Sequence, residues 1–393
     1  MNYNVTANAS VTDLLSHRSG LYTAAGDLLE DLGYDRAYIL AHLDQQPLDA
    51  FRATYHYSNF GYTSGGEAAA VAAGQSWEDL ADATLFGPMG MTRSSYRHAD
   101  YLAHENRARL HVRNGDPAEA RWLAKFDRQP DAEAPAGGAS ASIDDMARFL
   151  RLQLGGGTFK GQQIIDADAL AVTHAPHQIS GAPRTPLSHA SFYGLGWNVS
   201  YDTHGRVRLS HSGAFNLGTS TNVTLIPGED LGIVILTNGE PIGVPEAIAN
   251  SFLDIVQDGG QTVDWPGLFG RIFQSIRDAE AADFAYTTPP ADARPPRALA
   301  GYTGTFENDY YGPVTVTEGS GGLSLAIGPQ AAPTVYVLTP YDADTFTFVP
   351  VGENAVPIAG AAFQRGPGGA VSGVVLDYYD QRGLGTFHRA DAR

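Results

Sequence analysis

The sequence predicts an α/β fold of the α+β type: an antiparallel sheet flanked by helices, with a helical subdomain, followed by a small all-β barrel. Three observations predict it. Apolar residues recur at helical spacing through much of residues 11–154. Four extended segments with short connections occupy residues 192–238, as in an antiparallel meander. A proline-rich stretch at 287–296 then precedes a region with only strand-like segments.

Composition narrows the class of protein. The chain has 393 residues, 43% of them hydrophobic and 17% charged, which is typical of a globular protein of two or three domains. The 43 acidic and 25 basic residues give a net charge of -18, and a field of that sign repels nucleic acid. With no cysteine, the chain has no disulfide, thiol nucleophile or cysteine-ligated zinc.

The start of the sequence and its apolar segments do not identify the cellular compartment of the protein. No apolar run reaches the roughly 20 residues of a membrane span, so we expect no span. The polar start at Met1 shows no signal peptide. The compartment therefore stays open between the bacterial cytoplasm and the periplasm or exterior.

Short helices are expected first. Thr12 or Asp13 can cap a helix that ends before Gly20. Residues 26–44 carry leucines and isoleucines at helical spacing around Gly33.

Longer helices follow. One is expected over residues 65–73 and ends at Gly74. Ser76 begins a segment that resembles a capping box and starts a second helix, and Ser142 precedes a third. Residues 94–136, which separate the second helix from the third, are polar and irregular, so we expect them to form loops over a cleft.

Four strands are expected next, at residues 192–200, 206–211, 219–227 and 231–238. Residues 231–236 are apolar on both faces, which predicts a strand in the middle of the sheet under helices. Helices starting near Pro245 and Asp264 complete this part. We therefore predict a first domain over residues 1–285, a linker over 286–298 and a β-barrel domain over 299–393.

Tyr57, Ser58 and Asn59 form the first candidate site. A polar triplet at a helix start can place a phenol and an amide side by side on rigid backbone, facing a cleft. For such a triplet taken alone, a well-packed helix start is the favoured interpretation, so the triplet alone is a weak signal.

The second candidate is His211-Ser212-Gly213-Ala214 at the end of an expected strand. Gly213 would let a substrate approach the backbone, the Ala214 N–H would donate to an oxyanion, and His211 would be a polar wall or proton partner. The alternative is a polar strand end with a glycine bulge.

Other candidates are weaker. In the segment Ser16-His17-Arg18-Ser19-Gly20, a serine and a histidine two residues apart do not face one another on a helix, and no Gly-x-Ser-x-Gly motif occurs in the sequence. We therefore expect these polar groups to have a structural role. The histidines lack zinc-site spacing, so we expect no metal, and we expect no cofactor.

Six motifs in this order resemble the serine β-lactamase and penicillin-binding-protein superfamily, class C branch, which includes esterases, D-amino-acid peptidases and amide hydrolases. The resemblance covers residues 5–285 and rests on residues 11–21, 57–62, 86–91, 135–138, 193–197 and 211–213. Residues 301–312 and 383–387 resemble the lipocalin-like barrel domain often appended to these hydrolases.

The resemblance implies roles for the candidates. Tyr57 would be the general base beside the nucleophile, and Asn59 would hold the acyl-side amide or carbonyl of a small ester, amide or peptide substrate. His211 stands where β-lactamases and transpeptidases carry lysine. A histidine is mostly neutral at pH 7 and binds a substrate carboxylate less strongly, which favours an esterase or peptidase.

The family nucleophile is missing from this sequence. The family serine lies in Ser-x-x-Lys, but Lys125 follows Trp122 by three residues and Lys160 follows Gly157. We therefore expect the chain to begin inside a longer ancestor or gene, to leave sheet edges uncovered, and to be inactive alone. A non-catalytic remnant or binding protein, and complementation by a separate N-terminal segment in trans, stay open as alternatives.

Overall fold

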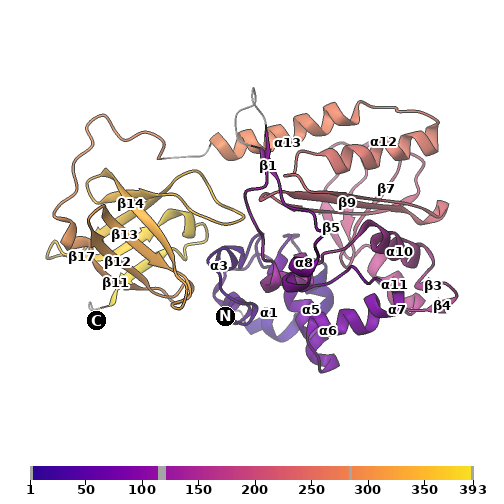
Figure 1. Ribbon diagram of the computed structural model, residues 1–393, viewed down its shortest axis with the longest axis horizontal. Helices are drawn as coiled ribbons and strands as arrows, with labels where there is room; N and C mark the ends of the chain where they lie inside the picture. The colour runs from indigo at the N-terminus through magenta and orange to yellow at the C-terminus, as the bar shows by residue number, and fades with distance from the viewer. Residues whose placement is uncertain (1–2, 114–120, 283–285, 391–393) are drawn as a thin grey trace. The chain divides into compact units, whose positions relative to one another are not determined.

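The computed structural model describes residues 3–113, 121–282 and 286–390 and divides into two compact units (Figure 1). The first unit comprises Met1–Ala25 and Leu48–Arg277, and the second comprises Gly26–Pro47 and Asp278–Arg393. The α+β class with a C-terminal barrel is confirmed. The expected domain boundary at residue 285 lies outside the described residues.

Helices make up most of the first half of the first unit. They are α1 (Tyr3–Asn8), α2 (Val11–Leu15), α5 (Asn59–Ala73), α6 (Trp77–Ala81), the π-helical turn η2 (Asp82–Phe86), α7 (Gly87–Met89), α8 (His98–Ala103), η3 (Asp131–Glu133), α9 (Ala134–Gly137), α10 (Ile143–Leu154) and α11 (Ala167–His174). Two short hairpins, β1 (Val112–Arg113) with β2 (Trp122–Leu123) and β3 (Thr158–Phe159) with β4 (Gln162–Gln163), accompany them.

Serine caps begin four of these helices, α2, α5, α6 and α10. Ser76 and Ser142 accept hydrogen bonds from the third residue of α6 and α10, as expected. The cap of α2 is Ser10, which forms a reciprocal capping box with Asp13, so the expectation of Thr12 or Asp13 as the cap was wrong.

Helix α5 packs unusually closely on its neighbours because it contains adjacent glycines. A Cβ atom on Gly65 would lie 2.8 Å from the Leu15 side chain, and one on Gly66 would lie 2.5 Å from Pro135 Cβ. These distances leave no room for a methyl group. Glycine inside a helix lowers its intrinsic stability, and here the close packing of α2 and α9 on α5 explains its presence.

The second half of the first unit is a six-stranded antiparallel meander in the order β10-β9-β8-β7-β6-β5. The expected strand over residues 192–200 is two strands, because Gly196 has a φ of 90° and turns the chain between them. The strands are β5 (Gln178–Gly181), β6 (Ser191–Tyr193), β7 (Asn198–Tyr201), β8 (Val207–Phe215), β9 (Thr219–Ile226) and β10 (Leu231–Thr237).

Strand β10 lies at the edge of the sheet, so the expectation of a central strand was wrong. It pairs with β9 over seven residues without a bulge, and in the described residues no strand pairs with its other side. It contacts α10 and α12 (Val244–Asp258), which lie on opposite faces of the sheet (Figure 1). A strand that is apolar on both faces is typical of the middle of a sheet. Apolar composition indicates that both faces are covered, but it does not show that a second strand pairs with the other edge.

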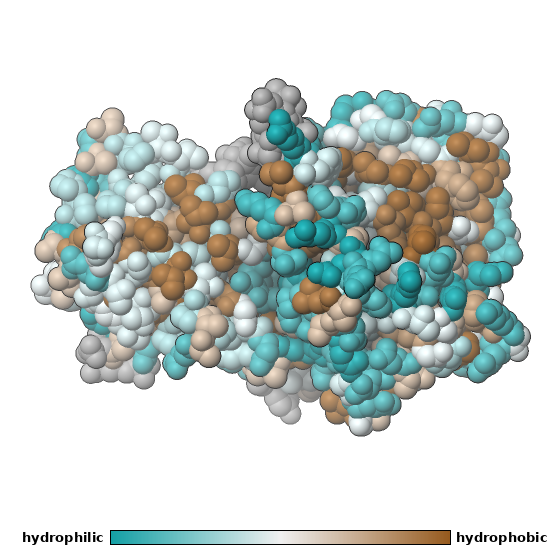
Figure 2. Space-filling view, in the orientation of Figure 1, coloured by the Kyte–Doolittle hydropathy of each residue, from teal (hydrophilic) through white to brown (hydrophobic). Residues whose placement is uncertain are grey.

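Exposed apolar side chains accompany this open edge. Leu236 in β10 is 37% exposed, and Ile248 and Ile255 on α12 are 45% and 57% exposed. Figure 2 shows hydrophobic residues gathered between α12 and α10 on this unit. Natural sheets rarely leave a long uncharged edge open, because it pairs with other chains.

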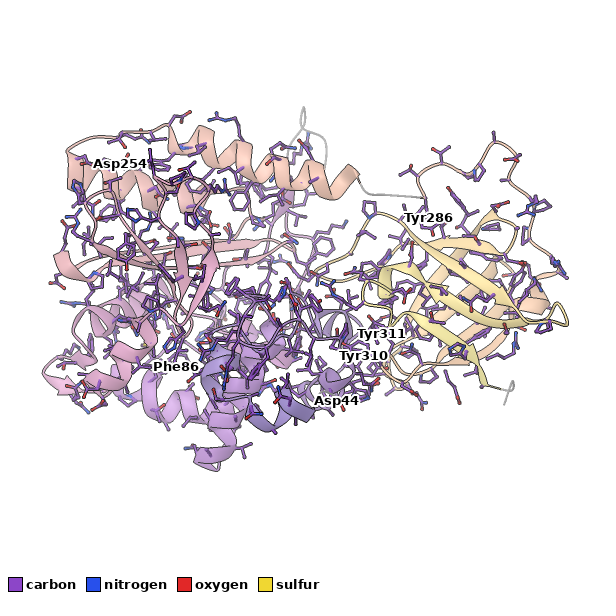
Figure 3. All side chains as sticks on the ribbon, turned by 180° about the vertical axis from the view of Figure 1, so that it is seen from behind. Asp44, Phe86, Asp254, Tyr286, Tyr310 and Tyr311 are labelled. Atoms are coloured by element: carbon purple, nitrogen blue, oxygen red, sulfur yellow. The ribbon has the colours of Figure 1, made fainter. Side chains whose placement is uncertain are left out.

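Helix α13 (Trp265–Ala282) follows α12 through a turn that one carboxylate organises. Asp254 Oδ2 on α12 accepts hydrogen bonds from the backbone N and Oγ1 of Thr262 and from Trp265 Nε1 (Figure 3). Burial raises the pKa of Asp254, but these hydrogen bonds outweigh that effect and lower it. In the described part of the chain, none of the helices is long and apolar enough to span a membrane.

The second unit contains a closed barrel of eight antiparallel strands in sequential order. Alternate side chains fill its interior, among them Phe306, Leu325, Phe346 and Val374, each at most 1% exposed. The strands are β11 (Gly304–Glu307), β12 (Val314–Gly319), β13 (Gly322–Ile327), β14 (Thr334–Asp342), β15 (Thr345–Phe348), β16 (Ala359–Arg365), β17 (Val371–Leu376) and β18 (Thr386–Arg389).

Two helices from the N-terminal part of the sequence belong to this second unit: α3 (Asp27–Asp31) and α4 (Arg36–His42). Tyr34 Oη donates to the backbone oxygen of Tyr311 at 2.7 Å, and Tyr38 Oη donates to that of Tyr310 at 3.2 Å. Figure 3 shows Tyr310 and Tyr311 beside the barrel. Asp31 accepts from the backbone N of Glu353. The helical spacing around Gly33 is confirmed, but this docking could not be expected from the sequence.

We expect Gly66→Ala to lower the free energy of unfolding of the first unit by about 1–3 kcal/mol, because the added methyl group overpacks α5 against Pro135. Urea denaturation followed by tryptophan fluorescence measures this unit, since all 4 tryptophans lie in it. Gly270→Ala in α13 is the control. Its Cβ meets nothing within 4 Å, so we expect a gain of about 0.5–1 kcal/mol. Equal effects of the two substitutions would contradict the packing argument.

Candidate active site

Tyr57 precedes the first turn of α5. Ser58 is the N-cap of this helix, and its Oγ accepts from the backbone N of Gly61 at 3.1 Å. Asn59 is the first helical residue, so the helix starts six residues before the expected residue 65. Asn59 is half-buried, and in the described part of the chain no protein group hydrogen-bonds its amide. Tyr57 is 36% exposed.

His17 fixes the backbone on both sides of Tyr57. Its carbonyl oxygen accepts from the backbone N of His56 at 3.0 Å, and its Nδ1 accepts from the backbone N of Ser58 at 3.2 Å. Its φ of 57° lies in the left-handed region, which is uncommon for a non-glycine residue. Its ring centroid lies 4.4 Å from that of Tyr57.

The His17 ring is neutral. It is 3% exposed, and burial, with a smaller repulsion from His211, lowers its pKa to about 3. Since Nδ1 accepts a hydrogen bond, the proton of the neutral ring lies on Nε2. The rings of Tyr55, Tyr62 and Tyr193 surround it, with centroid distances of 5.9, 5.8 and 4.8 Å. Burial raises the pKa of Tyr55 to about 12.

His211 approaches Tyr57 from the sheet. It lies on β8, and its ring centroid is 6.1 Å from that of Tyr57. Tyr193 Oη and His211 Nε2 are 3.1 Å apart. Burial lowers the pKa of His211, so this wall of the site is uncharged at neutral pH.

The part of β8 that carries His211, Gly213 and Ala214 has a free edge. Strand β7 pairs with β8 only over residues 207–210, whereas β9 pairs with it as far as Phe215. Among the described residues, no strand pairs with residues 211–215 on the β7 side. Gly213 and Ala214 are exposed. Backbone groups on this edge can therefore hydrogen-bond an extended ligand.

The structure thus brings Tyr57 and His211 together at the free edge formed by Gly213 and Ala214, with Asn59 following at the start of α5. Two contacts of this group were not predicted from the sequence: Tyr193 with His211, and His17 with Tyr57. Tyr193 could have been selected from the sequence, because it precedes Gly194 in one of the motifs that resemble the family. The contacts of His17 could not, because its aromatic neighbours come from segments distant in the sequence.

Ser16 and Arg18 have structural roles in the turn that carries His17. Ser16 Oγ donates to the backbone oxygen of Thr12 at 2.6 Å, so it does not act with His17 as a catalytic pair. Arg18 and Arg52 both bind the buried Asp13. Burial raises the pKa of Asp13, but hydrogen bonds from Arg52, Ser10 and Arg18 together lower it well below its usual range.

Possible metal ligands and the lysines were the remaining candidates for chemistry in this unit. In the described ranges, no group of three or more histidine, aspartate or glutamate side chains could hold a metal ion. The chain's lysines, Lys125 and Lys160, lie over the rings of neighbouring Phe126 and Phe159. Neither follows a serine by three residues.

Comparison with known proteins gives consistent matches. The family model Beta-lactamase matches residues 2–257, and one described as a domain of unknown function (DUF3471) matches residues 288–385. Penicillin-binding protein 4 of Amycolatopsis lactamdurans is 28% identical over 315 residues, covering 78% of this chain and 73% of that protein. Unguisins hydrolase ungD of Aspergillus violaceofuscus (strain CBS 115571) is 23% identical over 406 residues, covering 93% and 69%.

A solved structure has the same fold. The octameric penicillin-binding protein homologue from Pyrococcus abyssi superimposes with a TM-score of 0.54 at 16% sequence identity. The match covers 94% of this chain and 76% of that one. At this identity the likeness concerns the fold.

We expect the free energy of unfolding of the first unit to fall as the pH is lowered from 7 to 5, because buried neutral His17 must be protonated on unfolding. Its folded pKa is below the unfolded value of about 6.5, so this stabilisation is present above that pH and is lost below it. The slope from one such histidine approaches about 1.4 kcal/mol per pH unit.

Urea denaturation at several pH values measures this slope. His17→Asn should reduce it, since asparagine tolerates a positive φ and its amide oxygen can accept from Ser58 N–H. His104→Asn, at an exposed histidine, should leave it unchanged. An unaltered slope in His17→Asn would contradict the assignment.

Proposed function

The chain belongs to the beta-lactamase family, and on that premise we propose that it forms the base-bearing side of a serine-hydrolase site. The proposed substrates are small esters, amides or peptides, cleaved through an acyl-enzyme. The observation that carries the proposal is the meeting of Tyr57 and His211, 6.1 Å apart by ring centroids, at the free edge of β8.

Each candidate residue has a role in this proposal. Tyr57 takes the proton from the nucleophile and returns it to the leaving group. The Asn59 amide holds the acyl side of the substrate. The N–H of Ala214 donates to the developing oxyanion, and Gly213 allows the substrate to lie against the strand. A single oxyanion donor of this kind contributes roughly 10²–10³ in rate.

The absence of charge on His211 affects which class of substrate the proposed site would bind. A permanently charged side chain at this position would attract a substrate carboxylate, whereas burial lowers the pKa of His211 and keeps it uncharged at pH 7. This favours esterase or peptidase action over β-lactamase action.

We infer further that the nucleophile comes from a segment outside the given sequence, either upstream in the same polypeptide or separate. No Ser-x-x-Lys occurs in these 393 residues. The open edge of β10 and the exposed apolar residues of α12 are a surface that such a segment would cover. By itself, the chain then has negligible acyl-transfer activity.

A second candidate function is that of a non-catalytic binding protein with the same cleft. The absence of Ser-x-x-Lys from the sequence favours it. In that case ligands bind at the free edge of β8 without turnover, and Tyr57→Phe leaves function unchanged.

Labelling with a fluorophosphonate probe tests the proposal. We expect the chain alone to show no labelling that heat denaturation abolishes, because it lacks the activated serine. Co-expression with the polypeptide translated from the DNA upstream of Met1 should restore labelling and p-nitrophenyl ester hydrolysis if an in-frame Ser-x-x-Lys is present there.

Tyr57→Phe in the reconstituted protein should reduce hydrolysis by about 10²–10⁴-fold, the usual contribution of a general base. The matched control is Tyr201→Phe, at an exposed tyrosine of β7. Strong heat-sensitive labelling of the chain alone would refute the need for an outside nucleophile, and full activity of Tyr57→Phe would refute the role of the base.

A further inference from the structure

One end of the barrel holds α3 and α4 through backbone groups of its connecting loops. We call residues 26–47, which contain both helices, the arm. Between β15 and β16, the backbone N–H groups of Glu353 and Asn354 donate to the Asp31 carboxylate at 2.8 and 3.2 Å. The carbonyl oxygens of three successive residues between β11 and β12 accept hydrogen bonds from arm side chains: Asp309 from Gln45 at 3.2 Å, Tyr310 from Tyr38 at 3.2 Å and Tyr311 from Tyr34 at 2.7 Å.

Two glycines in these loops leave room for the arm. A Cβ atom on Gly328, between β13 and β14, would lie 2.9 Å from the backbone oxygen of Leu32. One on Gly352, between β15 and β16, would lie 2.3 Å from Cγ of Asp31. In a barrel whose antiparallel strands follow one another in sequence, every second connection lies at the same end. Three connections at one end of this barrel therefore contact the arm.

The two ends of the arm continue into the turn that carries the candidate base. Leu21 and Leu48, just outside the arm, form an antiparallel bridge. Three further backbone hydrogen bonds of 2.9–3.0 Å continue this pairing, and the last of them joins the His56 N–H to the His17 carbonyl oxygen. Tyr57 follows directly, so the arm is the long connection between the two segments that form this turn.

The arm links the order of the turn to the barrel. An undocked arm would be a long flexible loop, and bringing the ends of such a loop together costs conformational entropy. A docked arm has already lost that freedom through its hydrogen bonds to the barrel, so the pairing of residues 17–21 with 48–56 does not have to supply the ordering. Docking of the arm and order of the turn therefore stabilise each other.

We propose that the function of the barrel is to hold the arm, and that the held arm keeps the turn carrying His17 and Tyr57 ordered. The family model that matches residues 288–385 is described as a domain of unknown function and gives the barrel no role. Asp31 and Tyr34 are then positioning residues, which act through the turn and not on the substrate. The catalytic importance of Tyr57 rests on the proposed function, but the ordering itself requires no nucleophile.

Hydrogen exchange of backbone amides in the full chain, followed by NMR, tests this proposal. The amides of His56 and Ser58 report on the turn, because both donate to His17. The amide of Ile39, inside α4, reports on the arm. In Asp31→Ala, which leaves two barrel N–H groups without their carboxylate, we expect the exchange of all three amides to become at least about tenfold faster.

Matched variants separate docking from general stability. Asp31→Asn keeps an oxygen that can accept from the Glu353 N–H, so all rates should stay within about threefold of those of the unmodified chain. Tyr302→Phe removes a buried hydrogen bond to Asp344 Oδ1, which lies in a connection at the opposite end of the barrel, and should leave the two turn amides unchanged. The amide of Leu225, a buried residue of β9, should exchange at the same rate in every variant, which shows that the first unit stays folded.

Tyr34→Phe tests docking a second time without removing a ring. It deletes only the hydrogen bond to the Tyr311 carbonyl oxygen, so the same three amides should exchange about three- to tenfold faster. Unchanged exchange at Ile39 in both this variant and Asp31→Ala would overturn the proposal, because the barrel would then not be what holds the arm.

Two other results would overturn it as well. Faster exchange at Ile39 with unchanged exchange at His56 and Ser58 would show that the arm detaches without disturbing the turn. Equal acceleration of the turn amides by Tyr302→Phe would show that barrel stability, and not arm docking, controls them.

This outcome is separable from that of the proposed function. Coupled exchange of arm and turn, with no hydrolysis by the reconstituted protein, would refute the proposed function alone. Hydrolysis that depends on Tyr57, with uncoupled exchange, would refute the role of the barrel alone.

Discussion

The geometry of the candidate site depends on the two hydrogen bonds that His17 makes to the backbone on either side of Tyr57. One uses its carbonyl oxygen, and the other uses its Nδ1, which accepts a hydrogen bond only while it carries no proton. The residue has a positive φ of 57°. Ser58 then begins α5, and the glycines of α5 let that helix lie directly against α2, which leads into His17. The turn, the cap and the helix packing together hold the phenol of Tyr57 near His211.

Local signals in the sequence predicted the parts of this fold that local chemistry decides. Serine caps, glycine helix ends and strand alternation identified most helices and the antiparallel sheet. Tyr57 and His211, which the sequence selected as candidates, lie with ring centroids 6.1 Å apart. Two features could not be predicted, because each depends on partners distant in sequence: the edge position of β10 and the ring contact of His17 with Tyr193. The early start of α5 has a local signal in the Ser58 cap, but the glycines of its first turns lower helix propensity and hid it.

The electrostatics of the site follow from burial more than from formal charge. His17 and His211 both lose their usual affinity for a proton because aromatic side chains and strands exclude water from them.

The assignment of α3 and α4 to the barrel unit affects how the protein can be made. The hydrogen bond from Tyr34 to Tyr311 joins residues 277 positions apart in sequence. During synthesis these two helices leave the ribosome long before the strands on which they dock, so they must wait without their partners while the intervening unit folds. A ribosome that stalls within the barrel would therefore leave an early segment undocked as well as a late one, and quality-control proteases would find two separate cleavage sites in one unfinished chain.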